Sequence, residues 1–76
     1  MFNNLVGEVI RELRNNANLS QEKLAELSNL DRTYISLIER GKRQPTIQTL
    51  FKIAKSLGIP PSEIISVIEK RNEDSF

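Results

Sequence analysis

The sequence predicts an all-α domain built from five short helices. Apolar residues recur at the three- and four-residue spacing of helices, and no segment shows the two-residue alternation of a strand. Proline, glycine and asparagine stand between the apolar segments, where helices begin and end. The chain has 76 residues and 38% hydrophobic content, so we expect one compact domain over 1–76, near the lower size limit for a self-sufficient core.

The first helix is expected to run from Asn3 or Asn4 to Asn15. Asn15, Asn16 and Asn18 then indicate a turn. Helical spacing assigns five apolar residues to the buried side of this helix: Leu5, Val6, Val9, Ile10 and Leu13.

The segment over about 20–40 is expected to form two helices joined by a tight turn. Ser20 is a good N-cap for the first of them, because its hydroxyl can accept a hydrogen bond from an otherwise unpaired backbone amide. Leu24 and Leu27 supply an apolar face, and Ala25 is small where the two helices would cross. Asn29 stands in the turn and tolerates the positive φ that such turns need.

The next helix begins after Asp31, a good N-cap, and ends at Gly41, which tolerates the left-handed conformation. Ile35 and Ile38 lie close together on the helical wheel and define its buried direction. A short helix with a polar outward face, held by a preceding helix, is typical of motifs that contact the DNA major groove. The outward and flanking positions are Arg32, Thr33, Tyr34, Ser36, Leu37 and Arg40.

Two more helices are expected after a loop over 42–45. Thr46 is the expected N-cap of the fourth helix, and Gly58 ends it. Pro61 suits the first turn of the fifth helix, which should reach about Arg71, with 72–76 frayed. The apolar residues of the fourth helix are Ile47, Leu50, Phe51, Ile53, Ala54 and Leu57.

Composition excludes several functional classes. The chain has no cysteine and no histidine, which removes disulfides, the usual zinc ligands and the commonest general base. No nucleophile with a paired base and no phosphate-binding loop is visible, so we expect no enzyme, no metal and no cofactor. The N-terminus lacks the features of a signal peptide and no apolar run is long enough to span a bilayer, so we expect a cytoplasmic protein without membrane contact.

Charge is distributed unevenly along the chain. Between Arg40 and Lys55 there are five basic residues and no acidic one, whereas acidic residues predominate after Gly58. This distribution predicts one face that attracts phosphate and another that avoids it.

The motifs together resemble the Cro/CI-type helix-turn-helix regulators, the fold of phage repressors such as lambda repressor. The matching residues are Leu-Ser-Gln-x-x-Leu-Ala from Leu19, Tyr-Ile-Ser-x-Ile-Glu-Arg-Gly from Tyr34, and Pro45-Thr46, and the similarity covers about 5–68. Within this family, the run from Ser28 to Ser36 and the short chain resemble the controller proteins of restriction-modification systems.

The resemblance implies a dimeric, sequence-specific DNA-binding transcription regulator. A controller would activate its own operon at low concentration and repress it at high concentration. The alternatives are a phage-type repressor, another small regulator, or an antitoxin that binds a toxin protein. The expected partners are operator DNA, a second copy, a further dimer on an adjacent site and the polymerase sigma subunit.

Outward residues of the third helix are the candidates for DNA contact. Arg32 suits a bidentate contact to guanine, and the alternative is a phosphate contact or a solvated side chain. Tyr34 is expected on the sugar-phosphate backbone, or else half-buried against the second helix. By resemblance, the loop residue Arg43 contacts DNA and Gln21 holds a phosphate. The expected base contacts are Arg32, Thr33, Ser36, Leu37 and Arg43, and the expected backbone contacts are Gln21, Tyr34, Arg40, Gln44, Thr46, Thr49 and Lys52.

The fifth helix is the candidate for dimerisation, over about 61–71. Its four apolar residues cover an arc of roughly 160°, more than a terminal helix needs for docking to a small domain. We expect part of the arc to pair with a second copy, and the alternative is that all of it is core. A two-fold dimer would place two recognition helices about one DNA turn apart. The four residues are Ile64, Ile65, Val67 and Ile68.

The resemblance assigns roles to two further pairs of charged residues. Arg14 and Glu39 match a partly buried ion pair that joins the first helix to the end of the third, the alternative being two independent surface charges. Glu22 and Glu26 match an acidic patch that contacts the sigma subunit in phage activator-repressors. The alternative for this second pair is a solvated helix face beside Lys23.

Overall fold

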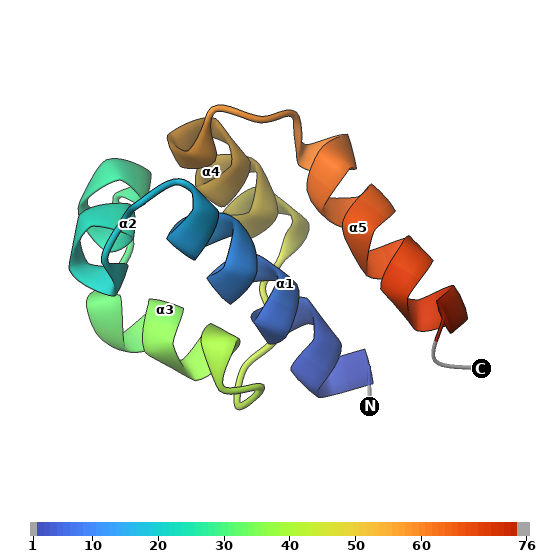
Figure 1. The fold of residues 1–76 in the computed structure, drawn as a ribbon. Coiled ribbons are helices and arrows are strands. Elements are labelled where there is room, and N and C mark those ends of the chain that lie inside the picture. The colour runs from blue at the N-terminus through green and yellow to red at the C-terminus, as the bar shows by residue number, and fades with distance from the viewer. Residues whose placement is uncertain (1, 75–76) are drawn as a thin grey trace.

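The computed structural model describes residues 2–74, with side chains described over 4–73. Five helices pack around one apolar centre (Figure 1), and no strand occurs within this part of the chain. The all-α, five-helix prediction is confirmed. The helices are α1 (Phe2–Asn16), α2 (Gln21–Ser28), α3 (Arg32–Glu39), α4 (Ile47–Leu57) and α5 (Pro61–Asp74).

The predicted caps determine where the three central helices begin. The backbone N–H of Lys23 donates to Ser20 Oγ at 2.9 Å, and that of Thr33 donates to Asp31 Oδ1 at 2.8 Å. Thr46 Oγ1 accepts from the N–H of the residue three positions later at 3.1 Å. Each side chain pairs an amide that has no partner inside its helix.

Two residues that were predicted to lie where helices end have the left-handed backbone conformation. Asn29 has φ 55° between α2 and α3, and Gly58 has φ 74° after α4. Asparagine tolerates this region better than most residues, and glycine enters it without a steric cost.

The core lies between α1, α3, α4 and α5, with α2 packed on α3 and α4. Its largest fully buried side chains come from all five helices: Val9, Ile10, Leu24, Ile35, Ile38, Ile53 and Ile64. None of the described helices is both long enough and apolar enough to cross a membrane.

The structure corrects three residues that helical spacing assigned to apolar faces. Leu27 is 50% exposed, Ile47 66% and Phe51 59%, so these side chains do not pack in the core. The spacing correctly predicted the helices. The apolar faces of α2 and α4, however, are wider than the area that the neighbouring helices cover.

The end of α5 also differs from the prediction. The helix continues to Asp74 instead of ending near Arg71, whereas Ser75 and Phe76 lie outside the described residues. Arg71 pairs with Glu12 of α1, which ties the end of α5 to the domain. The hydrogen bond from Arg71 and its charge hold the pKa of Glu12 below its ordinary value. The tie is therefore present above the unfolded-state pKa of that carboxyl and lost as the pH falls through the lowered value.

Candidate nucleic-acid interface

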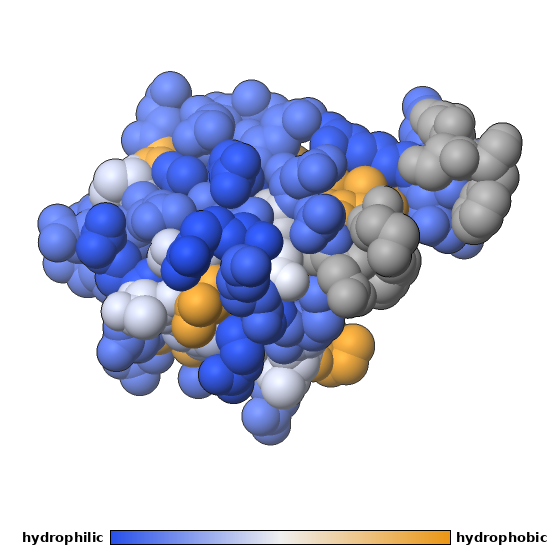
Figure 2. Space-filling model, turned by 90° about the horizontal axis from the view of Figure 1, so that it is seen from below, coloured by the Kyte–Doolittle hydropathy of each residue, from blue (hydrophilic) through white to orange (hydrophobic). Residues whose placement is uncertain are grey.

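Helix α3 presents its polar side to solvent. Ile35 and Ile38 are fully or almost fully buried, whereas Arg32 and Thr33 at the opposite side are exposed. Ser36 and Leu37 are partly exposed on the same side. In Figure 1, α3 lies along the lower edge of the molecule, and the view of that side in Figure 2 is largely hydrophilic. Five described residues predicted from the helical wheel thus lie on or beside one outward surface: Arg32, Thr33, Ser36, Leu37 and Arg40.

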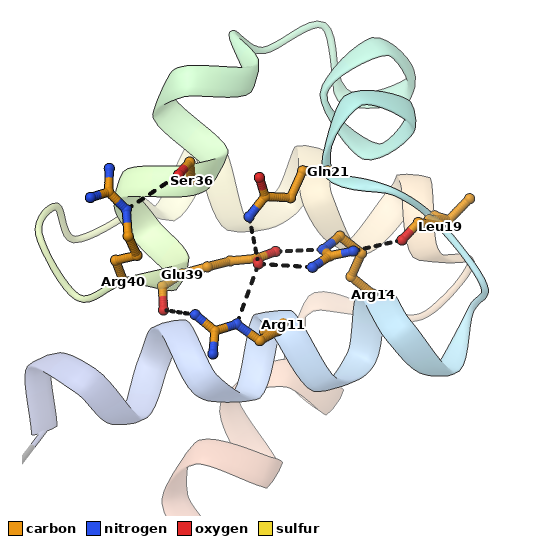
Figure 3. Close-up of polar contacts among 7 residues, drawn as sticks. All are labelled: Arg11, Arg14, Leu19, Gln21, Ser36, Glu39 and Arg40. Carbon is orange, nitrogen blue, oxygen red and sulfur yellow. Dashed lines mark hydrogen bonds and ion pairs between the residues drawn. The ribbon is translucent and has the colours of Figure 1, made fainter.

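Glu39, at the end of α3, is the centre of the polar contacts that hold this helix (Figure 3). Its side chain is completely buried, and Arg14 donates to both carboxylate oxygens, at 2.6 and 3.0 Å. Arg14 also donates to Leu19 O at 2.7 Å, just before α2. The predicted ion pair is therefore present and links α1, α3 and the start of α2. A buried charge of this kind requires a full set of partners.

Arg11 is a second cationic partner of Glu39 that the sequence analysis missed. Its guanidinium donates to the Glu39 backbone carbonyl at 3.2 Å and lies 3.6 Å from Oε1 (Figure 3). The guanidinium thus gives a hydrogen-bond donor to a carbonyl at the C-terminal end of α3, where a positive charge is favourable. The signal available in the sequence is the spacing of Arg11 and Arg14, which places both on one side of a helix.

Gln21 has a structural contact that the sequence did not predict. Its side-chain amide donates to Glu39 Oε1 at 3.0 Å and is directed into the molecule. The side chain therefore fixes α2 to α3, because a buried carboxylate is a stronger acceptor than a solvent-exposed group. The amides at the start of α2 are also available for a phosphate, and the phosphate contact of Gln21 stays a prediction.

Tyr34 joins α3 to α4. The ring is half-buried and its hydroxyl lies 3.2 Å from Thr49 Oγ1. Thr49 is buried and also bonds Thr46 Oγ1 at 2.9 Å, so the prediction that Thr49 contacts a phosphate is wrong. A buried hydroxyl with two internal partners has no surface for DNA.

The loop after α3 places Arg43 over Tyr34. The guanidinium carbon lies 5.4 Å from the ring centroid, within the range of a cation–π contact. The loop backbone is held by bonds from the N–H groups of Lys42 and Arg43 to Leu37 O, at 2.8 and 3.3 Å. Arg43 is exposed in this position, beside the outward surface of α3.

Other predicted backbone contacts lie in different settings. Arg40 is exposed and donates to Ser36 Oγ at 3.3 Å. Gln44 and Thr46 are exposed next to the start of α4. Lys52 is exposed in the middle of α4, where it lines a groove with Leu27 and a second hollow with Ile47 and Gln48 at the start of the helix. Its contact with the DNA backbone stays a prediction.

The apolar arc of α5 is divided between core and surface. Ile64 and Ile68 are buried in the domain, so these two residues are corrected from dimer contacts to core. Ile65 is 46% exposed and Val67 is partly buried. Ile65 lies beside Leu50 along one shallow apolar hollow, and Ile47 and Phe51 of α4 are also exposed.

The acidic pair of α2 lies on the surface. Glu22 and Glu26 are both exposed, and Lys23 Nζ lies 2.8 Å from Glu26 Oε1. This hydrogen bond and the lysine charge lower the pKa of Glu26 below its ordinary value. Both side chains are exposed to a partner, although Glu26 already has a neighbouring cation.

No group of histidine, cysteine, aspartate and glutamate that could hold a metal ion occurs among the described residues. What the site offers is an exposed helix with hydroxyl, aliphatic and guanidinium groups, held by α2 and by the Glu39 contacts. A fixed helix with this surface is the arrangement that enters the DNA major groove. The fold and the site together define a Cro/CI-type helix-turn-helix DNA-binding domain.

Comparisons with known proteins agree with this class. The helix-turn-helix family model matches residues 10–64. The chain is 45% identical to control protein C.BamHI of Bacillus amyloliquefaciens, over 80% of this chain and 76% of that protein. The crystal structure of the restriction-modification controller protein C.AhdI from Aeromonas hydrophila superimposes with a TM-score of 0.79 at 44% identity, over 82% of this chain and 94% of the other. The controller protein C.Esp1396I, solved as a tetramer with its natural 35-base-pair operator, gives a TM-score of 0.83 at 40% identity, with 92% of each chain covered.

The chain therefore belongs to the helix-turn-helix family of transcription regulators, and within it to the restriction-modification controller proteins. It is a DNA-binding regulator and not an enzyme.

Proposed function

We propose that this protein is a homodimeric controller that binds two-fold operator sites upstream of a restriction-modification operon, which includes its own gene. The observation that carries the proposal is the exposed polar surface of α3, held rigidly by Glu39 and its partners. A protein that regulates this DNA works in the cytoplasm, so the proposal includes that location.

Each copy places α3 in the major groove. Arg32 and Arg43 supply guanidinium groups for base edges, of which guanine is the preferred partner. Thr33, Ser36 and Leu37 contact the remaining base edges and thymine methyl groups. Backbone contacts come from the amides at the start of α2 and from Tyr34, Arg40, Gln44 and Thr46, which surround the same surface.

The exposed apolar residues of α4 and α5 support the dimer. Ile47, Phe51 and Ile65 are among the four large hydrophobic residues that the described surface exposes. Burial of such side chains against a second copy is favourable by about 25 cal/mol for each Å² of apolar surface. The dimer surface thus combines Ile65 and the partly buried Val67 with α4, instead of using α5 alone. Two dimers on adjacent sites would add a further level of regulation.

Activation would use the acidic surface of α2. Glu22 and Glu26 are exposed carboxylates on α2, outside the α3 contact surface, so they remain accessible on the bound protein. We assign them to a contact with the polymerase sigma subunit. Replacing both with glutamine should lower activation while DNA affinity is retained or rises, because two negative charges near the phosphates are removed.

The test is transcription in vitro from the DNA upstream of the gene, with purified polymerase and increasing protein. The proposal predicts that transcription rises and then falls as two adjacent sites fill. The Glu22→Gln/Glu26→Gln protein should show only the fall. A steady decrease from the lowest concentration would indicate a simple repressor and contradict the controller function.

A further inference from the structure

We propose that a groove between α2 and α4 docks an acidic segment of a partner protein that carries a large apolar side chain. We call it the α2–α4 groove. It holds about 460 Å³ and is lined by Leu27, Ser28, Asn29, Lys52, Lys55 and Ser56. The inference goes beyond the proposed regulation of an operon, because it concerns the groove between α2 and α4 and not the outward surface of α3.

The groove has a fixed base. Ser28 Oγ and Ser56 Oγ lie 2.8 Å apart and join the ends of the two helices. Ser56 Oγ also donates to the backbone carbonyl of Lys52 at 3.0 Å. Ser28 is buried, so this link lies beneath the surface residues and the groove is formed before any partner binds.

Charge decides what kind of partner fits. Lys52 and Lys55 are exposed at three-residue spacing on α4, so both lie along the same side of the groove. No residue of α4 is acidic, and over residues 4–73 neither lysine has a carboxylate partner. Two uncompensated ammonium groups attract carboxylates, and this complementarity steers and selects the partner.

The apolar part of the groove adds a second requirement. Leu27 is 50% exposed although its helical spacing suits a core position. A large apolar side chain of the partner would cover Leu27, across the groove from the two lysines, and this burial is favourable. A purely acidic segment would leave this leucine exposed to water.

The position of the groove separates it from the DNA surface. The C-terminal ends of α2 and α4 lie in the upper left part of Figure 1, whereas α3 lies along the lower edge. A single duplex bound to α3 therefore leaves the groove accessible. The same position argues against phosphate as the occupant and in favour of a protein segment that binds together with DNA.

The test uses the full chain labelled with ¹⁵N and a short peptide of aspartate, glutamate and leucine. Its matched control peptide carries asparagine and glutamine in place of the acids. The acidic peptide should shift the amide resonances of Leu27, Asn29, Lys52 and Lys55, and the neutral peptide should bind at least about tenfold more weakly. Lys52→Gln/Lys55→Gln should lose the binding, whereas Lys70→Gln, an exposed lysine of α5, should retain it.

Three results would overturn the proposal. The peptide shifts resonances of α3 instead of the groove, or the two peptides bind equally well, or neither binds. A second copy as the true occupant would appear as groove resonances that move with protein concentration alone. Sedimentation of the Lys52→Gln/Lys55→Gln protein separates this case, because the proposal predicts an unchanged association state.

Discussion

Glu39 is a buried carboxylate whose partners come from two other helices. Arg14 and Arg11 approach from α1 and Gln21 from α2, so a single side chain fixes the recognition helix to both. Removing one partner from a buried ion pair costs more than the pair itself contributes, because the remaining charge stays desolvated. The partners of Glu39 therefore make unequal and testable contributions.

Arg14→Ala should destabilise the domain strongly. The substitution leaves the fully buried Glu39 without its bidentate partner, at a cost of roughly 3–5 kcal/mol in the free energy of unfolding. Urea denaturation followed by circular dichroism measures the change. Arg11→Gln is the matched control and should cost much less, because Arg11 is 47% exposed. A free energy of unfolding near wild type for Arg14→Ala would contradict the role of the pair.

Arg32→Ala should weaken operator binding without changing stability. Arg32 is exposed and has no structural partner among the described residues, so its loss should remove only the proposed DNA contact. A bidentate base contact contributes about 1–3 kcal/mol, or roughly 5- to 150-fold in affinity. Fluorescence anisotropy over a range of salt concentrations measures this effect. An unchanged salt dependence indicates a base contact, whereas a slope lowered by about one indicates phosphate.

At the residue scale, the sequence predicted helix caps better than it predicted hydrogen-bond partners on other helices. The caps Ser20, Asp31 and Thr46 depend only on neighbouring residues, and all three are confirmed. Thr49 was expected at a phosphate but is buried against Tyr34, and the bond from Gln21 to Glu39 was not predicted, because both partners lie on another helix. Which polar group bonds which depends on tertiary packing, and spacing alone does not carry that information.

At the scale of elements, the contact between α1 and α3 requires a glycine. A Cβ at Gly7 would lie 2.2 Å from Ile38 O and 2.8 Å from Glu39 O. Both atoms belong to the backbone at the end of the recognition helix, which cannot move aside as a side chain would. The signal in the sequence was a lone glycine within the apolar pattern of the first helix, which often marks a close packing contact.

Gly7→Ala should therefore destabilise the protein although alanine favours helices. Overpacking of this kind costs about 1–3 kcal/mol or more, and the forced separation should also shift α3 and lower DNA affinity. Thermal unfolding and anisotropy check the two effects. Glu8→Ala, at the adjacent exposed position, is the control and should leave both unchanged. Stability equal to wild type for Gly7→Ala would show that α1 and α3 separate at little cost.

The number and order of the helices could be predicted from the sequence. Which neighbouring element covers each apolar helix face could not. Periodicity identified the apolar sides of α2 and α4, but Leu27, Ile47 and Phe51 extend beyond what the neighbouring helices cover. Similarly, α5 reaches Asp74, beyond the expected end, where a long-range pair between Arg71 and Glu12 ties it to α1. Helical spacing predicts a face, and only packing decides whether the same chain or another covers it.

At the scale of the whole molecule, an exposed apolar residue can be changed to test dimer formation without disturbing the fold of the single chain. Ile65→Glu should dissociate the dimer while the domain stays folded, because Ile65 is 46% exposed in the single chain. A charge buried in the interface would be unpaired, which strongly disfavours association. Sedimentation velocity measures the association state. Ser66→Glu, at the next exposed position, is the control and should leave the dimer intact. If Ser66→Glu dissociates the dimer and Ile65→Glu does not, the interface lies elsewhere.

In the proposed dimer, two copies of α3 contact one operator in successive major grooves. Hydroxyl-radical footprinting of the DNA upstream of the gene, compared with methylation interference in the major groove, would detect this arrangement. We expect protected half-sites related by two-fold symmetry, with the major-groove contacts about one helical turn apart, and loss of these contacts with Arg32→Ala. A single unpaired site, or a footprint that Arg32→Ala leaves unchanged, would contradict it.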